Sequence, residues 1–252
     1  MAHKIIISGC NGKMGQVVEA ICNADSEVTV VAGFDIASEA RSYPVYSSPD
    51  NFSGEADVVI DFSNPAALDG LLSFCIRRQI PLVLATTGFS PQQLEQINEA
   101  SKSIAIFRSA NMSLGINVLL ELVKKAAAVL GDSYDIEIVE KHHNRKVDAP
   151  SGTALMIADA AASSLSFEPE YIYERHSVRQ SRDKKEIGIS AVRGGTIVGV
   201  HEIMFAGRDE IIEIKHTAMS REIFANGAVK AAKFLTHHPA PGLYDMSMLV
   251  QE

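Results

Sequence analysis

Short apolar segments alternate with helix-forming segments between residues 4 and 107, and this alternation constrains the fold more than any other feature. Five segments have the length and β-branched content of buried strands: 4–7, 27–34, 57–61, 81–86 and 103–107. Two helix starts are indicated, one by Asn64 followed by Pro65 and the other by the run Ser90 to Gln93. The second has the sequence of a capping box. Such alternation over short turns is typical of a parallel sheet covered on both faces. The sequence therefore predicts an α/β domain with a doubly wound parallel sheet.

The pattern changes after Asn111. An amphipathic helix follows, with an apolar stripe of Leu119, Leu122, Val123, Ala126, Ala127 and Leu130. The next expected elements are a strand over 135–140, a helix from about Ser151, a loop over 168–185, strands over 187–193, 197–206 and 211–217, and a final helix from about Ser220. Ile212 and Ile214 alternate with charged residues, as in a half-buried strand. Consecutive strands without helices between them predict a second, α+β domain with a mixed or antiparallel sheet.

Composition excludes several classes of protein. The chain has 252 residues, of which 46% are hydrophobic and 21% charged, an ordinary globular balance. No apolar run approaches the roughly 20 residues that a membrane helix needs, and the N-terminus lacks the pattern of a secretory signal. The three cysteines form no metal-binding spacing, so we expect no metal and a reducing, cytoplasmic location. A net charge of −8 argues against a nucleic-acid partner, and it requires local positive charge wherever an anion binds.

A glycine-rich turn joins the first strand to the first helix. Gly9, Gly12 and Gly15 give the spacing G-x-x-G-x-x-G, with Asn11 where the usual dinucleotide fingerprint has its second glycine. Asp35 ends the second strand, 20 residues after Gly15, where an acidic side chain can bind the adenosine ribose. The alternative is an ordinary strand–helix turn. The register of strand, helix, glycines and acid favours a Rossmann-like dinucleotide site.

Two further segments follow parallel strands. Thr86, Thr87 and Gly88 end one strand, and the run Ser109 to Met112 ends another. Ligands of doubly wound sheets bind at the carboxyl ends of strands, so both segments are candidates for the nicotinamide side. They are equally compatible with plain turns and helix caps.

The stretch from Glu140 to Ala154 carries the strongest chemical signal. Five of the six residues from Lys141 to Lys146 can be positive, which suits an anionic substrate. Ser151, Gly152 and Thr153 then open a helix whose N–H groups and hydroxyls can hold a carboxylate. Histidine and lysine can supply protons. The alternative is a solvated basic loop before a normally capped helix. Because neighbouring strand residues face opposite ways, we expect His142 and His143 to differ in role.

The stretch E-K-H-H-N-R-K-V-D-A-P-S-G-T-A resembles the signature of the dihydrodipicolinate reductase family, also named 4-hydroxy-tetrahydrodipicolinate reductase. G-C-N-G-K-M-G at the N-terminus, D-F-S at 61–63, A-T-T-G-F at 85–89 and F-A-N-G-A-V at 224–229 resemble the same family in the same order. The resemblance covers nearly the whole chain. It implies reduction of a cyclic imine dicarboxylate by NADH or NADPH with loss of water, in lysine and diaminopimelate biosynthesis.

The resemblance also implies roles for individual residues. His142 is the expected proton donor and acceptor, and Lys146 a second proton donor. The expected substrate-binding residues are His143, Lys146, Ser151, Gly152 and Thr153. The expected cofactor-binding residues are Gly9, Cys10, Asn11, Gly12, Lys13, Met14, Asp35, Ala85, Thr86, Thr87, Ser109, Ala110, Asn111 and Met112.

The family's last helix packs back on the nucleotide domain, so we expect a discontinuous chain layout. Residues 1–113 with 222–252 would form the dinucleotide-binding domain, and 114–221 the substrate-binding and oligomerisation domain. The resemblance implies a homotetramer built through the second sheet, with a dimer as the alternative.

One departure from the family pattern concerns the cofactor. Some members follow the acid after the second strand with an arginine that can meet a 2′-phosphate, whereas this chain has Ile36. We therefore expect dual use that leans toward NADH, with Lys13 as a partial substitute for the missing charge.

Two competing functions remain at this point. Another two-domain reductase or amino-acid dehydrogenase would keep the glycine turn but would not require the His-His-x-x-Lys and Ser-Gly-Thr block. A non-catalytic nucleotide sensor would need only the first domain's features.

Overall fold

The computed structural model describes residues 2–37 and 39–251. The chain divides into two compact units, Met1–Leu114 with Glu222–Glu252, and Gly115–Arg221. The functions that we assign to the two units remain predictions. Within the described ranges, no helix has the length and apolarity needed to cross a bilayer.

The first unit contains a seven-stranded, wholly parallel sheet in the order β12-β6-β5-β4-β1-β2-β3. Its strands are β1 (His3–Ser8), β2 (Val28–Phe34), β3 (Val45–Tyr46), β4 (Val58–Asp61), β5 (Leu82–Leu84), β6 (Ala105–Arg108) and β12 (Gly242–Tyr244). Its helices are α1 (Lys13–Asn23), α2 (Leu68–Arg78), α3 (Pro91–Ala100), α6 (Glu222–His237) and α7 (Met246–Gln251), with short 3₁₀ turns at Pro49–Asn51 and Pro65–Ala67. The predicted doubly wound sheet is confirmed.

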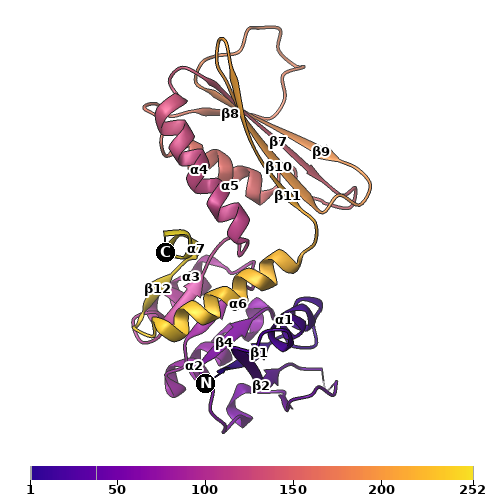
Figure 1. Cartoon of the computed structure of the whole chain (residues 1–252), viewed down its shortest axis with the longest axis vertical. Coiled ribbons are helices and arrows are strands. Elements are labelled where there is room, and N and C mark those ends of the chain that lie inside the picture. The colour runs from indigo at the N-terminus through magenta and orange to yellow at the C-terminus, as the bar shows by residue number, and fades with distance from the viewer. Residues whose placement is uncertain (1, 38, 252) are drawn as a thin grey trace. The chain divides into compact units, whose positions relative to one another are not determined.

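Two apolar layers enclose this sheet. On β1, Ile5 and Ile7 pack with α1 and α6, whereas Ile6 packs on the other side with α2 and α3. Figure 1 shows α6 running beside α1 although the two helices are about two hundred residues apart in sequence. A sheet buried on both faces explains why its strands are continuous apolar runs rather than alternating ones.

Strand order reverses at β1. The chain runs from β1 outward to β2 and β3 on one side, and to β4, β5 and β6 on the other. The segments that follow β1 and β4 therefore diverge and leave a crevice at the carboxyl edge, which is the usual ligand position in such sheets.

The second unit contains a five-stranded mixed sheet in the order β11-β10-β7-β9-β8. Its strands are β7 (Asp135–His142), β8 (Glu170–Ile172), β9 (Glu186–Arg193), β10 (Gly199–Ala206) and β11 (Ile211–Ala218). β7 pairs antiparallel with β10 and parallel with β9. Helices α4 (Leu114–Leu130) and α5 (Gly152–Ala162) cover one face and share its core (Figure 1). The expected mixed sheet is confirmed.

Three details of the expected second unit were wrong. The segment 168–185 is not all loop, because its residues 170–172 form the edge strand β8, too short to show a period. Leu122 is 51% exposed, since at 100° per residue it lies about 60° from Leu119, at the rim of the buried stripe. On β11, Ile212 is exposed and only Ile214 packs on the core, because β11 is an edge strand.

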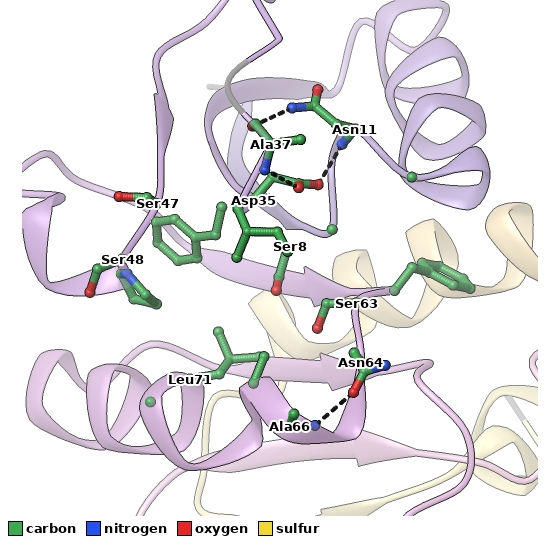
Figure 2. Close-up of a pocket in the computed structure, with 18 of the residues that line it drawn as sticks. Ser8, Asn11, Asp35, Ala37, Ser47, Ser48, Ser63, Asn64, Ala66 and Leu71 are labelled. Atoms are coloured by element: carbon green, nitrogen blue, oxygen red, sulfur yellow. Dashed lines mark hydrogen bonds between the residues drawn. The ribbon is translucent and has the colours of Figure 1, made fainter.

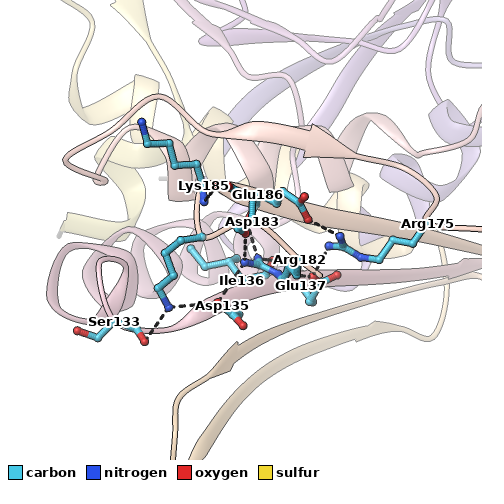
Figure 3. A network of polar contacts seen from close by, with 10 residues as sticks. Ser133, Asp135, Ile136, Glu137, Arg175, Arg182, Asp183, Lys185 and Glu186 are labelled. Carbon is cyan, nitrogen blue, oxygen red and sulfur yellow. Dashed lines mark hydrogen bonds and ion pairs between the residues drawn. The ribbon is translucent and has the colours of Figure 1, made fainter. Parts of the chain in front are cut away.

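The rest of the 168–185 segment is tied to β7 and β9 by arginines (Figure 3). Arg175 pairs with Glu137 and Glu186, and Arg182 pairs with Glu137 and Asp135. Arg182 also donates to the backbone carbonyls of residues 136 and 186. Polar side chains that looked like those of a solvated loop thus form a connected ionic network.

Candidate functional site: a nucleotide crevice and a buried histidine cluster

The glycine turn after β1 depends on two of its three glycines for steric reasons. Gly9 has φ +79°, and a Cβ there would lie 2.7 Å from the Phe62 carbonyl oxygen. A Cβ on Gly15 would lie 2.1 Å from the Gly9 carbonyl oxygen. The turn therefore packs against the segment after β4 at backbone distance, and only glycine fits either position.

Asn11 stands where a glycine was expected and holds the turn to the end of β2. Its backbone N–H donates to Asp35 Oδ2 at 2.9 Å, and its side-chain Nδ2 donates to the Ala37 carbonyl at 2.8 Å. The other Asp35 oxygen accepts from the Ala37 N–H at 2.9 Å. Figure 2 shows these contacts closing one wall of a cavity. Asp35 is therefore fixed in place by the backbone of the turn that it faces.

The cavity has a volume of about 650 Å³ and lies between the segments that follow β1, β2 and β4. Of the predicted cofactor residues, Gly9, Asn11, Gly12 and Asp35 line it. The lining also includes small polar residues that were not predicted as cofactor contacts: Ser8, Ser47, Ser48, Ser63 and Asn64. A glycine cradle, a fixed carboxylate and hydroxyl groups suit the pyrophosphate and ribose of a dinucleotide.

The remaining turn residues are oriented differently from one another. The Cys10 side chain is fully buried, and burial raises its pKa to about 11, so only its backbone is available to a ligand. Met14 packs on the core, whereas Lys13 is exposed. Their roles as cofactor contacts stay predictions.

Arg41 is a cation near the turn that sequence reading missed. Its Nε donates to Asn11 Oδ1 at 2.7 Å, and its guanidinium pairs with Glu19 at 3.2 Å and with Glu39 at 3.7 Å. The family pattern places an arginine directly after Asp35, whereas Arg41 follows Asp35 by six positions.

The two other predicted cofactor segments lie at the carboxyl ends of β5 and β6, which are neighbouring strands of the same sheet. Ala85, Asn111 and Met112 are buried, and Asn111 Oδ1 accepts from the Ser113 N–H at 2.9 Å. The described cavity is not lined by either segment. Their assignment to the nicotinamide side stays a prediction.

In the second unit, a buried polar cluster forms where β7 ends. Residues alternate along this strand, so Glu140 and His142 face the helices while Lys141 faces the open side and pairs with Glu202 at 3.6 Å. The five basic residues of 141–146 therefore do not all converge, because strand geometry sends Lys141 to the opposite face.

Glu140 is the centre of this cluster and has no exposed surface. Its Oε2 lies 2.6 Å from His142 Nδ1, its Oε1 accepts from the Ser151 N–H at 3.0 Å, and Arg193 donates to both oxygens at 2.7 and 2.8 Å. Burial raises the pKa of Glu140, but hydrogen bonds from Arg193, His142 and Ser151 outweigh it and hold that pKa below its usual value. The buried carboxyl is therefore ionised.

His201, from β10, is the second buried partner. Its Nε2 lies 3.0 Å from Ser151 Oγ, and its ring meets the His142 ring edge-on at 5.2 Å. Ser151 Oγ also accepts from the Ala154 N–H and so caps α5. Burial, and then the neighbouring His142, lowers the pKa of His201 to about 4, so this ring is neutral at physiological pH.

Lys146 and His143 occupy the loop between β7 and α5. Lys146 Nζ pairs with Asp148 at 2.8 Å, and the Lys146 N–H donates to the His143 carbonyl. Burial, and then the charges of Arg145 and Arg221, lower the pKa of His143, with a further contribution from Lys146. Arg193 also donates to the Asp148 carbonyl at 2.6 Å, and this contact joins the Lys146–Asp148 pair to the Glu140 cluster.

The structure brings His142, Ser151 and Lys146 into one neighbourhood with three residues that we did not predict: Glu140, Arg193 and His201. Glu140 could have been found from its period-2 spacing to His142. Arg193 and His201 come from strands more than 50 residues further along, and no local signal marks them.

Comparisons with known proteins show the family of the chain. Residues 3–112 match the family model described as dihydrodipicolinate reductase, N-terminus, and residues 115–250 match the one described as dihydrodipicolinate reductase, C-terminus. The chain is 56% identical to a 4-hydroxy-tetrahydrodipicolinate reductase of Caldanaerobacter subterraneus over 252 residues, which is 100% of both chains. It is 49% identical to one of Clostridium tetani over 248 residues, 98% of this chain and 96% of the relative.

Solved structures show the same fold. A dihydrodipicolinate reductase from Paenisporosarcina sp. with bound dipicolinate has a TM-score of 0.82 at 22% identity, covering 97% of this chain and 98% of its own. A diaminopimelate (DAP) dehydrogenase of Corynebacterium glutamicum is more distant, with a TM-score of 0.57 at 15% identity, covering 97% of this chain and 93% of its own. With both family models matched over nearly its whole length, the chain belongs to the dihydrodipicolinate reductase family.

Proposed function

We propose that the chain reduces 4-hydroxy-tetrahydrodipicolinate to tetrahydrodipicolinate with NADH or NADPH and releases water, in lysine and diaminopimelate biosynthesis. The observation that carries this proposal is the cluster of His142, Lys146 and the capped start of α5, in a chain whose relatives bear that reductase's name. The dipicolinate in the related structure supports a small planar dicarboxylate as the ligand.

The residues present fit a dinucleotide cofactor. The Gly9 and Gly15 positions leave no room for a Cβ, which keeps the turn's backbone close to the crevice, and Asp35 faces the same cavity. When bound, the nicotinamide supplies a hydride to the substrate carbon. Gly9, Asn11 and Gly12 would cradle the pyrophosphate, and Asp35 would accept from the adenosine ribose hydroxyls.

The substrate's two carboxylates need positive partners in a chain of net charge −8. In the proposal, Lys146 and His143 meet one carboxylate, and the Ser151–Thr153 start of α5 meets the other through its N–H groups and hydroxyls. Loss of the substrate hydroxyl as water requires a proton, which Lys146 or His142 supplies within this cluster.

The test is a direct assay. The purified chain with freshly generated substrate should oxidise NADH, and the product should be tetrahydrodipicolinate. A plain nucleotide sensor would bind NADH without turnover, and an amino-acid dehydrogenase would turn over an amino acid instead. Either result would overturn the proposal.

The cofactor preference that we propose is weak and leans toward NADH. Asp35 repels a 2′-phosphate, Ile36 is 96% exposed and carries no charge, and the Arg41 guanidinium is already engaged by Asn11 and Glu19. Lys13 can soften the preference by about 1 kcal/mol or less, because charge attraction at an exposed site is weak.

The measurement is kcat/KM for both cofactors at fixed ionic strength, in the parent and in Lys13→Ala. A strong NADPH preference in the parent would overturn the argument from Asp35.

Two further parts of the proposal concern assembly and location. We propose a homotetramer, with a dimer as the alternative, built through the face of the second sheet that α4 and α5 leave uncovered. A cytoplasmic location is supported by three cysteines that are all buried and free of disulfides.

A further inference from the structure

Glu140 is a fully buried carboxylate with four polar contacts. Three different elements reach it: His142 from its own strand, the Ser151 N–H at the start of α5, and Arg193 from β9. A carboxylate with no exposed surface is costly unless its oxygens are satisfied, and here all four contacts do so. Two of these partners, His142 and Ser151, belong to the proposed catalytic and substrate-binding groups.

The contact with His142 fixes where the imidazole carries its proton. An ionised carboxylate only accepts hydrogen bonds, so the 2.6 Å contact requires a hydrogen on Nδ1. A neutral His142 ring then presents an unprotonated Nε2, and a charged ring presents an N–H at that position. The Nε2 side lies toward β10, where a Cβ on Gly199 would come within 3.1 Å of it.

The contact with Ser151 fixes the start of α5 against the same carboxylate. Ser151 is buried, and it is also held through its hydroxyl by His201. One Glu140 oxygen therefore positions the helix start while the other positions the imidazole. A displacement of Glu140 would move both groups together.

Other charged and titratable groups around His142 do not duplicate this contact. Arg193 pairs with Glu140, and Lys146 pairs with Asp148. His201 is a neutral ring that meets His142 edge-on. His216, on β11, is half-buried. Among the contacts described for His142, the one to Nδ1 comes from Glu140 alone.

We propose that Glu140 is a positioning residue of the reaction: it holds His142 in the Nδ1–H form, with Nε2 directed away from the carboxylate, and fixes that ring relative to the substrate-binding start of α5. This rests on the proposed function for its catalytic consequence, whereas the tautomer itself does not depend on the substrate. Arg193 supports the arrangement by donating to both oxygens of Glu140 and neutralising their charge.

The test compares Glu140→Gln with Glu137→Gln. Glu137 is the matched control, since it lies on the same strand and also pairs with arginines, but it faces away from the histidine cluster. The side-chain amide that E140Q introduces can donate to Nδ1, which would release the constraint on the ring. We expect ¹⁵N spectra of histidine-labelled protein to show Nδ1–H for His142 in the parent and in E137Q, and a new Nε2–H population in E140Q.

The kinetic arm uses the same proteins. We expect kcat to fall about 10²-fold or more in E140Q, in the range typical of a misplaced acid–base group, while the KM for NADH stays near that of the parent. E137Q should keep the parent's kcat. A parent spectrum with the proton on Nε2, an E140Q spectrum identical to the parent's, or an E140Q kcat within twofold of the parent's would overturn the proposal.

Two safeguards keep the test decisive. If E140Q fails to fold because Arg193 loses its partner, the double variant Glu140→Gln with Arg193→Met removes both buried charges and is measured instead. If the parent shows no turnover, the proposed function fails, and the tautomer spectra still decide the role of Glu140.

Discussion

At the scale of single residues, each group of the second unit that we propose to act in the reaction is held by a polar partner. His142 is fixed by Glu140, Ser151 by Glu140 and His201, and Lys146 by Asp148. Groups held in this way lose little further freedom when a ligand binds, which favours a preorganised site.

Lys146→Ala should reduce kcat by about 10²–10⁴, because the variant lacks the proposed proton donor and one positive partner of the substrate. The lysine is paired with an exposed acid, Asp148, so the fold should tolerate the change. Steady-state kinetics and thermal melting would be compared with Lys102→Ala, an exposed lysine of the first unit paired with Glu99. A near-normal kcat with a normal melting temperature would refute the role of Lys146.

His201 should make the protein sensitive to acid. The pKa of His201 is about 4 in the folded protein and 6.5 in the unfolded chain. Below pH 6.5 the unfolded chain therefore binds a proton at this residue that the folded protein does not bind. The folded state therefore loses stability as pH falls from 6.5 toward 4, by about 3 kcal/mol at most. Above pH 6.5 this residue causes no change in stability.

The check is thermal melting at the two ends of that pH window. His201→Gln keeps a side-chain partner for Ser151 but cannot titrate, so its melting temperature should fall less on acidification than the parent's. His176→Gln serves as the control because that histidine is 94% exposed, and it should follow the parent. Equal pH dependence in all three proteins would show that His201 does not carry the effect.

At the scale of elements, local capping chemistry sets the starts of several helices. The capping box of Ser90 and Gln93 is present as predicted, and Asn64 caps the 3₁₀ turn that leads into α2. Ser151 caps α5 while its own N–H is held by Glu140. The start of α5 is therefore shaped by the neighbouring strand β7 as well as by its own residues.

Gly15→Ala should lower stability by about 1–3 kcal/mol and weaken NADH binding at least about tenfold, since the new Cβ would meet the Gly9 carbonyl at 2.1 Å and displace the turn. Gly70→Ala on α2 is the control for thermal melting alone, because no atom lies within 4 Å of the new Cβ although the residue lines the cavity. Its stability should be unchanged or higher, as alanine favours a helix. Identical melting temperatures for the two variants would contradict the steric argument.

At the scale of the whole molecule, α4 and α5 pack on one face of the second sheet, and no helix of residues 2–37 and 39–251 shares a core with the other face. Residues that alternate with the buried ones on β7, β10 and β11 face this side, among them Val139, Met204 and the 60% exposed Ile211. Glu202 bridges Lys141 and Lys215 on the same face at 3.6 Å each. An apolar surface with paired charges is suited to contact with another copy of the sheet.

Light scattering at micromolar concentration should give a tetramer or a dimer. Met204→Glu places a charge in the middle of this open face and should lower the assembly state. Val129→Glu adds the same charge on an exposed part of α4 and should leave assembly unchanged. A monomeric parent would contradict both assemblies.

The sequence by itself determined the longer helices and strands and their type, whereas the short edge strands β3, β8 and β12 were not predicted. Turn chemistry, capping residues and apolar periods act over a few neighbouring residues, so the parallel sheet, the glycine turn and the helix at Ser151 could all be predicted. The tertiary structure decided which side chains meet. Arg193 and His201 join Glu140 and His142 only because β9 and β10 flank β7, and Lys141 leaves the cluster because strand residues alternate. Such contacts depend on strand order and register over more than 50 residues, which no local pattern encodes.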